Sequence, residues 1–181
     1  SSRDLMEGAE FEDYQGYAHL AYTTDQFFST DRWGLTGEAG AFLDPFYSPG
    51  SDFITTANEL LGSLILADFD GKKDEMAERV EVCNAFYRLK YESTLRLYAK
   101  LYPIFGSFEI YRLKYLLDFN NYYNLVVWPF MADKLTDMAW LKEELKFGDF
   151  VLRAQDAMAD LFAKWGADLR AKGQYFAQNE G

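Results

Sequence analysis

From Ser51 onward, apolar residues recur at three- and four-residue spacing, and this periodicity is the feature that most constrains the fold. Such spacing puts apolar side chains on one face of a helix, and that face must pack against other helices. Glycine, proline and asparagine punctuate the region, so we predict several helices, over 51–68, 73–102, 108–128, 133–146 and 150–172. The expected breaks are Asp70-Gly71, Pro103, Asn120-Asn121 and Phe147-Gly148-Asp149.

The first 50 residues have a different pattern, which is typical of strands. Residues 17–23 are rich in strand formers, and residues 32–36 read as a short buried strand. Two or three strands before residue 38 are too few for a stable sheet. We therefore predict a mainly α chain whose N-terminal strands complete a sheet that lies partly elsewhere, with a domain boundary between 1–50 and 51–181.

The charge of the chain excludes some partners. The formal net charge is −11, and no run of Lys or Arg alternates with aromatic residues. Nucleic acid and anionic membranes are therefore not expected partners. No stretch is long and apolar enough to span a bilayer, and the N-terminus lacks the features of a signal peptide, so we expect a cytoplasmic location.

The chain has one cysteine and one histidine, and neither indicates a metal site. A single cysteine excludes an internal disulfide framework, and apolar neighbours mark Cys83 as a small buried hydrophobe. His19 alone cannot build a histidine-based metal site, and no metal-binding motif is present.

The segment from Asp31 to Gly50, DRWGLTGEAGAFLDPFYSPG, is dense in glycine and proline and leads into the helix at Ser51. It resembles the second flavin-binding motif of FAD-dependent halogenases and aromatic monooxygenases, the tryptophan halogenase-like family. In that superfamily a short strand ends in Gly-Asp, followed by small residues, an acidic-Pro pair and a Ser-x-Gly turn. The corresponding positions are Gly37-Glu38, Asp44-Pro45 and Ser48-Pro49-Gly50.

The resemblance implies an FAD cofactor and a set of residues that contact it: Gly37, Glu38, Asp44, Pro45, Tyr47, Ser48, Pro49 and Gly50. Residues 1–50 would be the C-terminal remnant of an α/β FAD-binding domain, and residues 51–181 a helical C-terminal domain. Flavin chemistry agrees with this resemblance, because the backbone must approach the cofactor closely. Glycine allows that approach, since it has no side chain and tolerates positive φ. The N-terminus of the following helix would offer free N–H groups to the negatively charged ring.

Two features of the family are missing from the chain. Its first motif, G-x-G-x-x-G, and its lysine and tryptophan motif are both absent. We therefore expect a missing N-terminal half or a partner subunit to complete the flavin site. Tyr47 replaces the glutamate of tryptophan halogenases, and Pro49 lacks the N–H of one of their two halide donors, so tryptophan-type halogenation is disfavoured.

Other polar clusters have ordinary explanations. The run Asn120-Asn121-Tyr122-Tyr123-Asn124 either bridges helices or lines a substrate pocket. Helical spacing makes Glu109, Arg112, Lys114 and Asp118 candidates for surface pairs. No catalytic residue is assigned.

Two functions remain open. The first is the C-terminal portion of a flavin-dependent oxidoreductase, monooxygenase- or halogenase-like, that acts on a hydrophobic or aromatic small molecule. The alternative is a non-catalytic helical interaction subunit derived from such an enzyme. Bound flavin would distinguish them.

Overall fold

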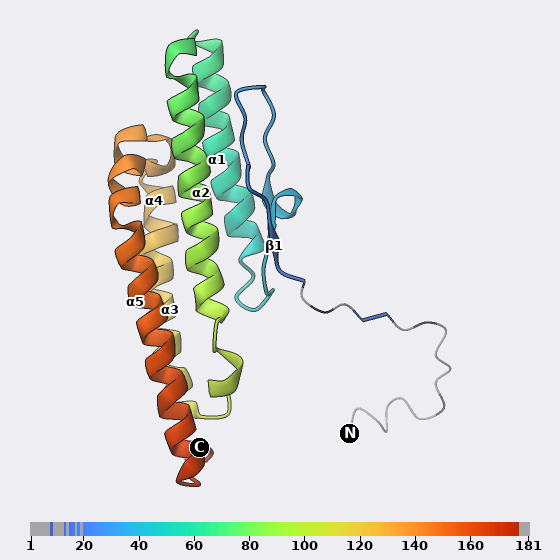
Figure 1. The fold of residues 1–181 in the computed structure, drawn as a ribbon, viewed down its shortest axis with the longest axis vertical. Coiled ribbons are helices and arrows are strands. Elements are labelled where there is room, and N and C mark those ends of the chain that lie inside the picture. Colours follow the sequence, from blue (N-terminus) through green and yellow to red (C-terminus); the bar gives the residue numbers. More distant parts are fainter. Residues whose placement is uncertain (1–7, 9–12, 14, 17, 19, 178–181) are drawn as a thin grey trace.

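The computed structural model describes residues 8, 13, 15, 16, 18 and 20–177. They form an elongated helical bundle with a small sheet beside it (Figure 1). The main helices are α1 (Gly50–Phe69), α2 (Met76–Tyr98), α3 (Phe108–Tyr122) and α5 (Met138–Ala171). A π-helix, Tyr123–Val127, joins α3 to the short α4 (Trp128–Met131). The prediction of a mainly α chain is confirmed.

The largest error in the sequence prediction concerns α5, which runs unbroken through Phe147-Gly148-Asp149. Gly148 is buried against α2, and a Cβ at this position would lie 3.1 Å from the side chain of Leu89. A glycine costs only about 1 kcal/mol in a helix interior. Here it allows α5 to approach α2 closely, so the residue marks a packing contact and not a break.

Two other helix ends differ from the prediction. Helix α2 ends at Tyr98 instead of residue 102, because Ala99 is extended and Lys100 has a φ of 61°. Helix α3 continues through Asn120-Asn121, and the irregular segment is the π-helix that follows. Pro129 is the second residue of α4 and directly follows the π-helix, where its missing N–H interrupts the regular helical hydrogen bonds.

The strands are shorter than predicted. Strand β1 (Tyr22–Thr23) pairs antiparallel with β2 (Ala41–Phe42), with Tyr22 opposite Phe42. Strand β2 lies after residue 38, where only loop was expected, and the expected strand at 32–36 is reduced to an isolated bridge between Phe28 and Gly34. Tyr17 and His19 lie outside the described residues. That these strands complete a larger sheet stays a prediction.

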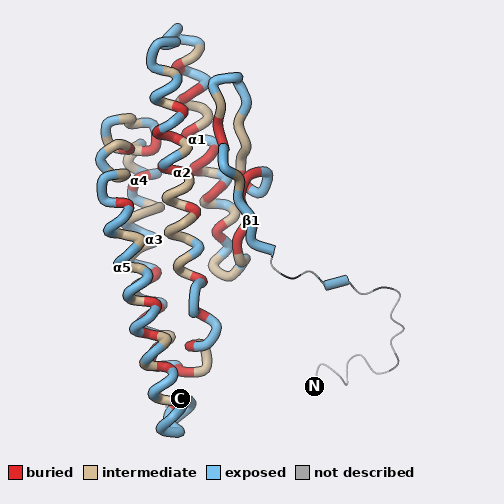
Figure 2. Tube along the Cα trace, viewed as in Figure 1, coloured by how far each residue is buried: buried red, intermediate tan, exposed pale blue. Residues whose placement is uncertain are grey.

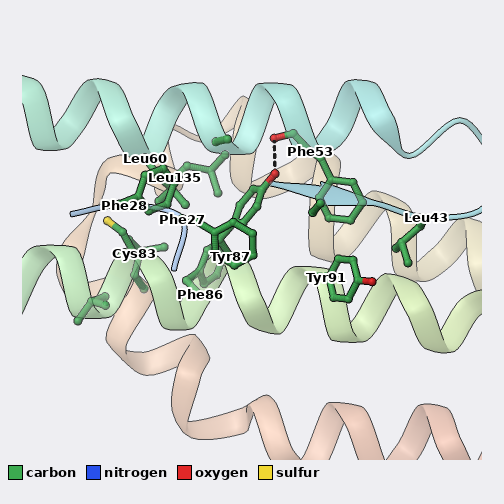
Figure 3. Close-up of a cluster of buried hydrophobic side chains, with 14 of the residues drawn as sticks. Phe27, Phe28, Leu43, Phe53, Leu60, Cys83, Phe86, Tyr87, Tyr91 and Leu135 are labelled. Carbon is green, nitrogen blue, oxygen red and sulfur yellow. Dashed lines mark hydrogen bonds between the residues drawn. The ribbon is translucent and has the colours of Figure 1, made fainter. Parts of the chain in front are cut away.

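The segment before α1 shares one hydrophobic core with the helices (Figures 2 and 3). Phe27 and Phe28 are fully buried and contact the ring of Tyr87 on α2. The Tyr87 hydroxyl donates to the carbonyl of Phe53 on α1, at 3.2 Å. Cys83 is buried as expected, and burial raises the pKa of its thiol to about 12.

Asn84 and Arg88 of α2 both hold the segment before α1, and Arg88 donates to the carbonyls of Thr24 and Asp25. The Asn84 Oδ1 accepts from the backbone N–H groups of Phe27 and Phe28 at 2.8 and 3.0 Å, and its Nδ2 donates to the carbonyls of Phe28 and Val80. Removing the Asn84 side chain leaves partly buried backbone groups without a partner.

We expect Asn84→Ala to lower the free energy of unfolding by about 2–3 kcal/mol, since each unsatisfied buried group costs about 1–3 kcal/mol. Urea denaturation measures this loss. The exposed Asn58 of α1 offers a matched control, and Asn58→Ala is expected to change stability by less than about 0.5 kcal/mol. Equal stabilities of the two variants would contradict the role given to Asn84.

Within the described residues, no helix has the length and apolar character needed to cross a bilayer. In the same part of the chain, no group of three or more His, Cys, Asp or Glu side chains is placed to bind a metal ion.

Candidate functional site

The loop over residues 37–50 leads into α1 through a strained turn. Tyr47 and Ser48 both have positive φ, 66° and 53°, which is costly for residues with a side chain. Ser48 donates its backbone N–H to the carbonyl of Pro45 at 2.8 Å, which closes the turn. Gly50 lies outside the left-handed region, so a requirement for positive φ does not explain this glycine.

A surface cavity of about 300 Å³ lies between this loop and the start of α1. Five of the eight residues expected to contact flavin line it: Glu38, Pro45, Ser48, Pro49 and Gly50. No side chain caps the N-terminus of α1. Backbone N–H groups at the start of α1 therefore lie at the wall of this cavity, an arrangement that suits a polar ligand.

The space in front of Gly50 is open. A Cβ at this position would have one neighbour within 4 Å, the Oε1 of Glu38 at 4.0 Å. Glu38 therefore brings an acidic side chain next to the helix start, as the resemblance implies. The main chain of Glu38 is held by Tyr22 of β1, whose hydroxyl donates to the Glu38 carbonyl at 2.5 Å.

The other three expected residues lie away from this cavity. Gly37 has a φ of 54° and packs on α1, where a Cβ would lie 2.5 Å from the Ile54 side chain. Asp44 accepts from the backbone N–H of Phe46 at 2.9 Å and from the Tyr102 hydroxyl, so it shapes the loop. Tyr47 points to a second cavity inside the bundle.

This inner cavity, about 280 Å³ in volume, lies between α1, α2, α3, the π-helix and α5. Its walls are mainly apolar and aromatic, as in small-molecule sites. Pro49 and Phe53 line both cavities, so the two adjoin at the start of α1.

Several polar groups face the inner cavity. Burial raises the pKa of Asp52, and the Tyr122 hydroxyl, which lies 3.3 Å from its carboxylate, acts in the opposite direction. Burial, followed by the charge of Asp118, raises the pKa of Tyr47 above its ordinary range. Burial lowers the pKa of Lys90 to about 8, and Glu144 opposes this shift.

The prediction of surface pairs on α3 is wrong for Lys114 and Asp118. They form a buried ion pair, with side chains only 6% and 5% exposed. Lys114 also donates to the carbonyl of Leu97 on α2 at 3.2 Å. Burial raises the pKa of Asp118, although Lys114 acts to lower it. Helical spacing cannot reveal that this face turns inward.

The asparagine run only partly fills its predicted roles, since Asn120 and Asn124 neither bridge separate helices nor line the cavity. Asn121 and Tyr122 line the inner cavity. Asn120 and Asn124 are exposed, and the Asn124 side chain donates to the Asn120 carbonyl at 2.7 Å within the same helix. Sequence reasoning missed Lys90 and Gln155. The signal for Lys90 was its place four residues after Phe86, on the apolar stripe of α2.

Comparison with known proteins relates the chain to flavin-dependent halogenases. It is 31% identical over 85 residues to a flavin-dependent halogenase from Dictyostelium discoideum. The matched stretch is 47% of this chain but only 14% of the relative's length. No family model and no solved structure matches the chain. The similarity is partial, and it supports descent from a flavin enzyme.

Proposed function

We propose that this chain is part of a flavin-dependent oxidoreductase of the monooxygenase or halogenase type. Its loop contacts the flavin, and its inner cavity holds a hydrophobic or aromatic small molecule. One observation carries the proposal: a cavity at the uncapped start of α1 adjoins an apolar cavity inside the bundle. The partial similarity to a flavin-dependent halogenase supports it.

In this proposal the residues of the chain bind the flavin and position the substrate. The backbone at Ser48, Pro49 and Gly50 and the carboxylate of Glu38 would hold the flavin, while Gly37 and Asp44 keep the loop in shape. Bound FAD would supply the redox chemistry. The adenosine part of FAD would bind a dinucleotide fold in an N-terminal half or a partner subunit, since the G-x-G-x-x-G motif is absent.

The inner cavity would exclude water from the reacting part of the substrate. Phe53, Leu97, Leu125 and Val126 give it apolar walls, and such a lining favours an aromatic or aliphatic ligand. The part of these residues in the reaction would be to orient the substrate.

Flavin content of the complete polypeptide is the direct test. We expect yellow protein with flavin absorbance in the blue region, and bleaching on reduction. A complete polypeptide that carries no flavin and binds none when FAD is added would reject the proposal.

A cytoplasmic location also stays a proposal, based on composition.

The alternative, a non-catalytic interaction subunit, is favoured by one observation. Exposed aromatic rings form a ladder along α3 and the π-helix, with centroids 4.4 Å apart for Tyr115 and Phe119 and 6.2 Å apart for Phe119 and Tyr123. Trp128 and Met131 of α4 extend the apolar surface. Large exposed apolar patches are typical of interaction sites, and flavin-free native protein would favour this reading.

We predict that the complete enzyme does not chlorinate free tryptophan at the rate of a dedicated halogenase. Pro49 has no N–H to donate to halide, and Tyr47 provides a phenol where tryptophan halogenases have a glutamate. Loss of acid–base assistance alone reduces rates by about 10²–10⁴. Mass spectrometry of tryptophan after reaction with FAD, reductant, oxygen and chloride measures this. Efficient formation of chlorotryptophan would contradict this prediction and make tryptophan halogenation the preferred activity.

A further inference from the structure

Lys90 is a half-buried lysine that forms no ion pair with the described residues, although the charge of Glu144 acts on it. Its ammonium donates to the carbonyl of Leu125 in the π-helix and lies 5.1 Å from the centroid of the Phe86 ring. No carboxylate of the described residues lies within ion-pair distance of it. An ammonium has three donors, and buried charges are normally paired because desolvation is costly. The cavity that Lys90 lines therefore offers an ammonium that is not engaged in an ion pair with the described residues.

The same cavity contains unused hydrogen-bonding capacity. Among the described residues, Gln155 Oε1 is buried at this cavity without a hydrogen-bond partner. The Tyr47 hydroxyl is buried there too, and it interacts with Asp118 and Tyr111. The Gln155 amide is held in place because its Nε2 donates to Ser93 Oγ at 2.9 Å. Buried polar groups are usually satisfied, so an acceptor without a partner at the cavity wall indicates that the cavity holds an occupant, water or ligand, that donates to it.

Acidic groups and the Lys90 ammonium lie at opposite ends of the cavity. Both carboxylates of the cavity, Asp52 and Asp118, lie toward the start of α1, and Lys114 balances the charge of Asp118. The unpaired carboxylate of Asp52 disfavours an anion at that end. Lys90 lies at the other end of the stretch of α2 that lines the cavity, seven residues before Leu97. This separation corresponds to about 10 Å along a helix.

We propose that the inner cavity binds a small apolar acid, whose carboxylate pairs with the Lys90 ammonium and whose apolar body extends toward Pro49. The inference rests on the proposed function only in treating this acid as the substrate. Lys90 is then the residue that selects and orients the ligand. The apolar end of the ligand points to the cavity beside the loop.

Two compounds of equal shape test the charge requirement, 4-phenylbutanoate and its neutral counterpart 4-phenylbutanamide. Calorimetric titration of the 181-residue chain at pH 7 is expected to give tighter binding of the acid by about tenfold or more, since a charge-assisted pair is stronger than a neutral hydrogen bond. In Lys90→Met, which keeps the length of the side chain, this preference is expected to disappear.

Lys142→Met is the matched control, because Lys142 is exposed and pairs with Glu78 at 2.6 Å. It should keep the preference for the acid. If Lys90→Met folds poorly by circular dichroism, Lys90→Gln serves in its place. Equal binding of the two compounds to the unaltered chain overturns the proposal, as does a preference that survives loss of the lysine charge, or binding of neither compound. The titration contains no flavin, so its outcome is independent of the flavin test above.

Discussion

Replacing Gly50 by valine is expected to weaken FAD binding by about tenfold to a hundredfold in the complete polypeptide. The branched side chain would occupy the open space in front of the first residue of α1, where a Cβ has only Glu38 as a neighbour at 4.0 Å. Flavin would then lose close contact with the free N–H groups there. A hydrogen bond to a charged partner contributes about 1.5–3 kcal/mol, and 1.4 kcal/mol corresponds to a factor of about ten.

The fold itself should tolerate this change. Gly50 has no positive φ, and no main-chain or core atom lies within 4 Å of the added Cβ. Gly62→Val is the matched control, twelve residues further along α1 at a glycine with open space around it. Quenching of FAD fluorescence measures both affinities. If Gly50→Val binds FAD as tightly as the unaltered chain and the two variants melt at the same temperature, the loop is not part of the flavin site.

Replacing Lys114 by methionine is expected to lower the free energy of unfolding by about 3–5 kcal/mol at pH 7. The substitution leaves the carboxylate of Asp118 buried without its cation, and it removes the hydrogen bond to the Leu97 carbonyl. Lys142→Met removes a surface pair instead and is expected to cost less than about 1 kcal/mol. Chemical denaturation gives both values.

The pH dependence gives this prediction a second test. Burial already raises the pKa of Asp118, and loss of Lys114, which acts to lower it, raises that pKa further. A carboxyl whose pKa is raised in the folded state binds protons more readily there than in the unfolded chain. Protonated Asp118 therefore contributes stability at low pH, and this contribution is lost as pH rises through the folded pKa. The difference in free energy of unfolding between Lys114→Met and the unaltered chain should shrink from pH 7 to pH 5.

A double substitution separates charge from packing. Lys114→Met combined with Asp118→Leu removes both charges, and we expect stability within about 1 kcal/mol of the unaltered chain. If the double variant is as unstable as Lys114→Met alone, the loss comes from packing, and the role given to the ion pair is wrong.

The sequence by itself determined the features that depend on neighbours along the chain. Spacing of apolar residues places α1 within one residue of its predicted ends, because a helix is built from contacts three and four residues apart. The dense glycine and proline pattern of residues 37–50 likewise indicated a structured loop before that helix, and Ser48-Pro49-Gly50 marked where the helix begins.

Only the tertiary structure decided how the helices face one another. Gly148 looks like a break until Leu89 of α2 is seen against it, and Lys114 and Asp118 look like a surface pair until their face turns inward. The inner cavity has the same origin, since Tyr47, Lys90 and Gln155 come from three separate segments. Contacts between distant segments depend on packing angles and side-chain volumes, which local periodicity does not encode.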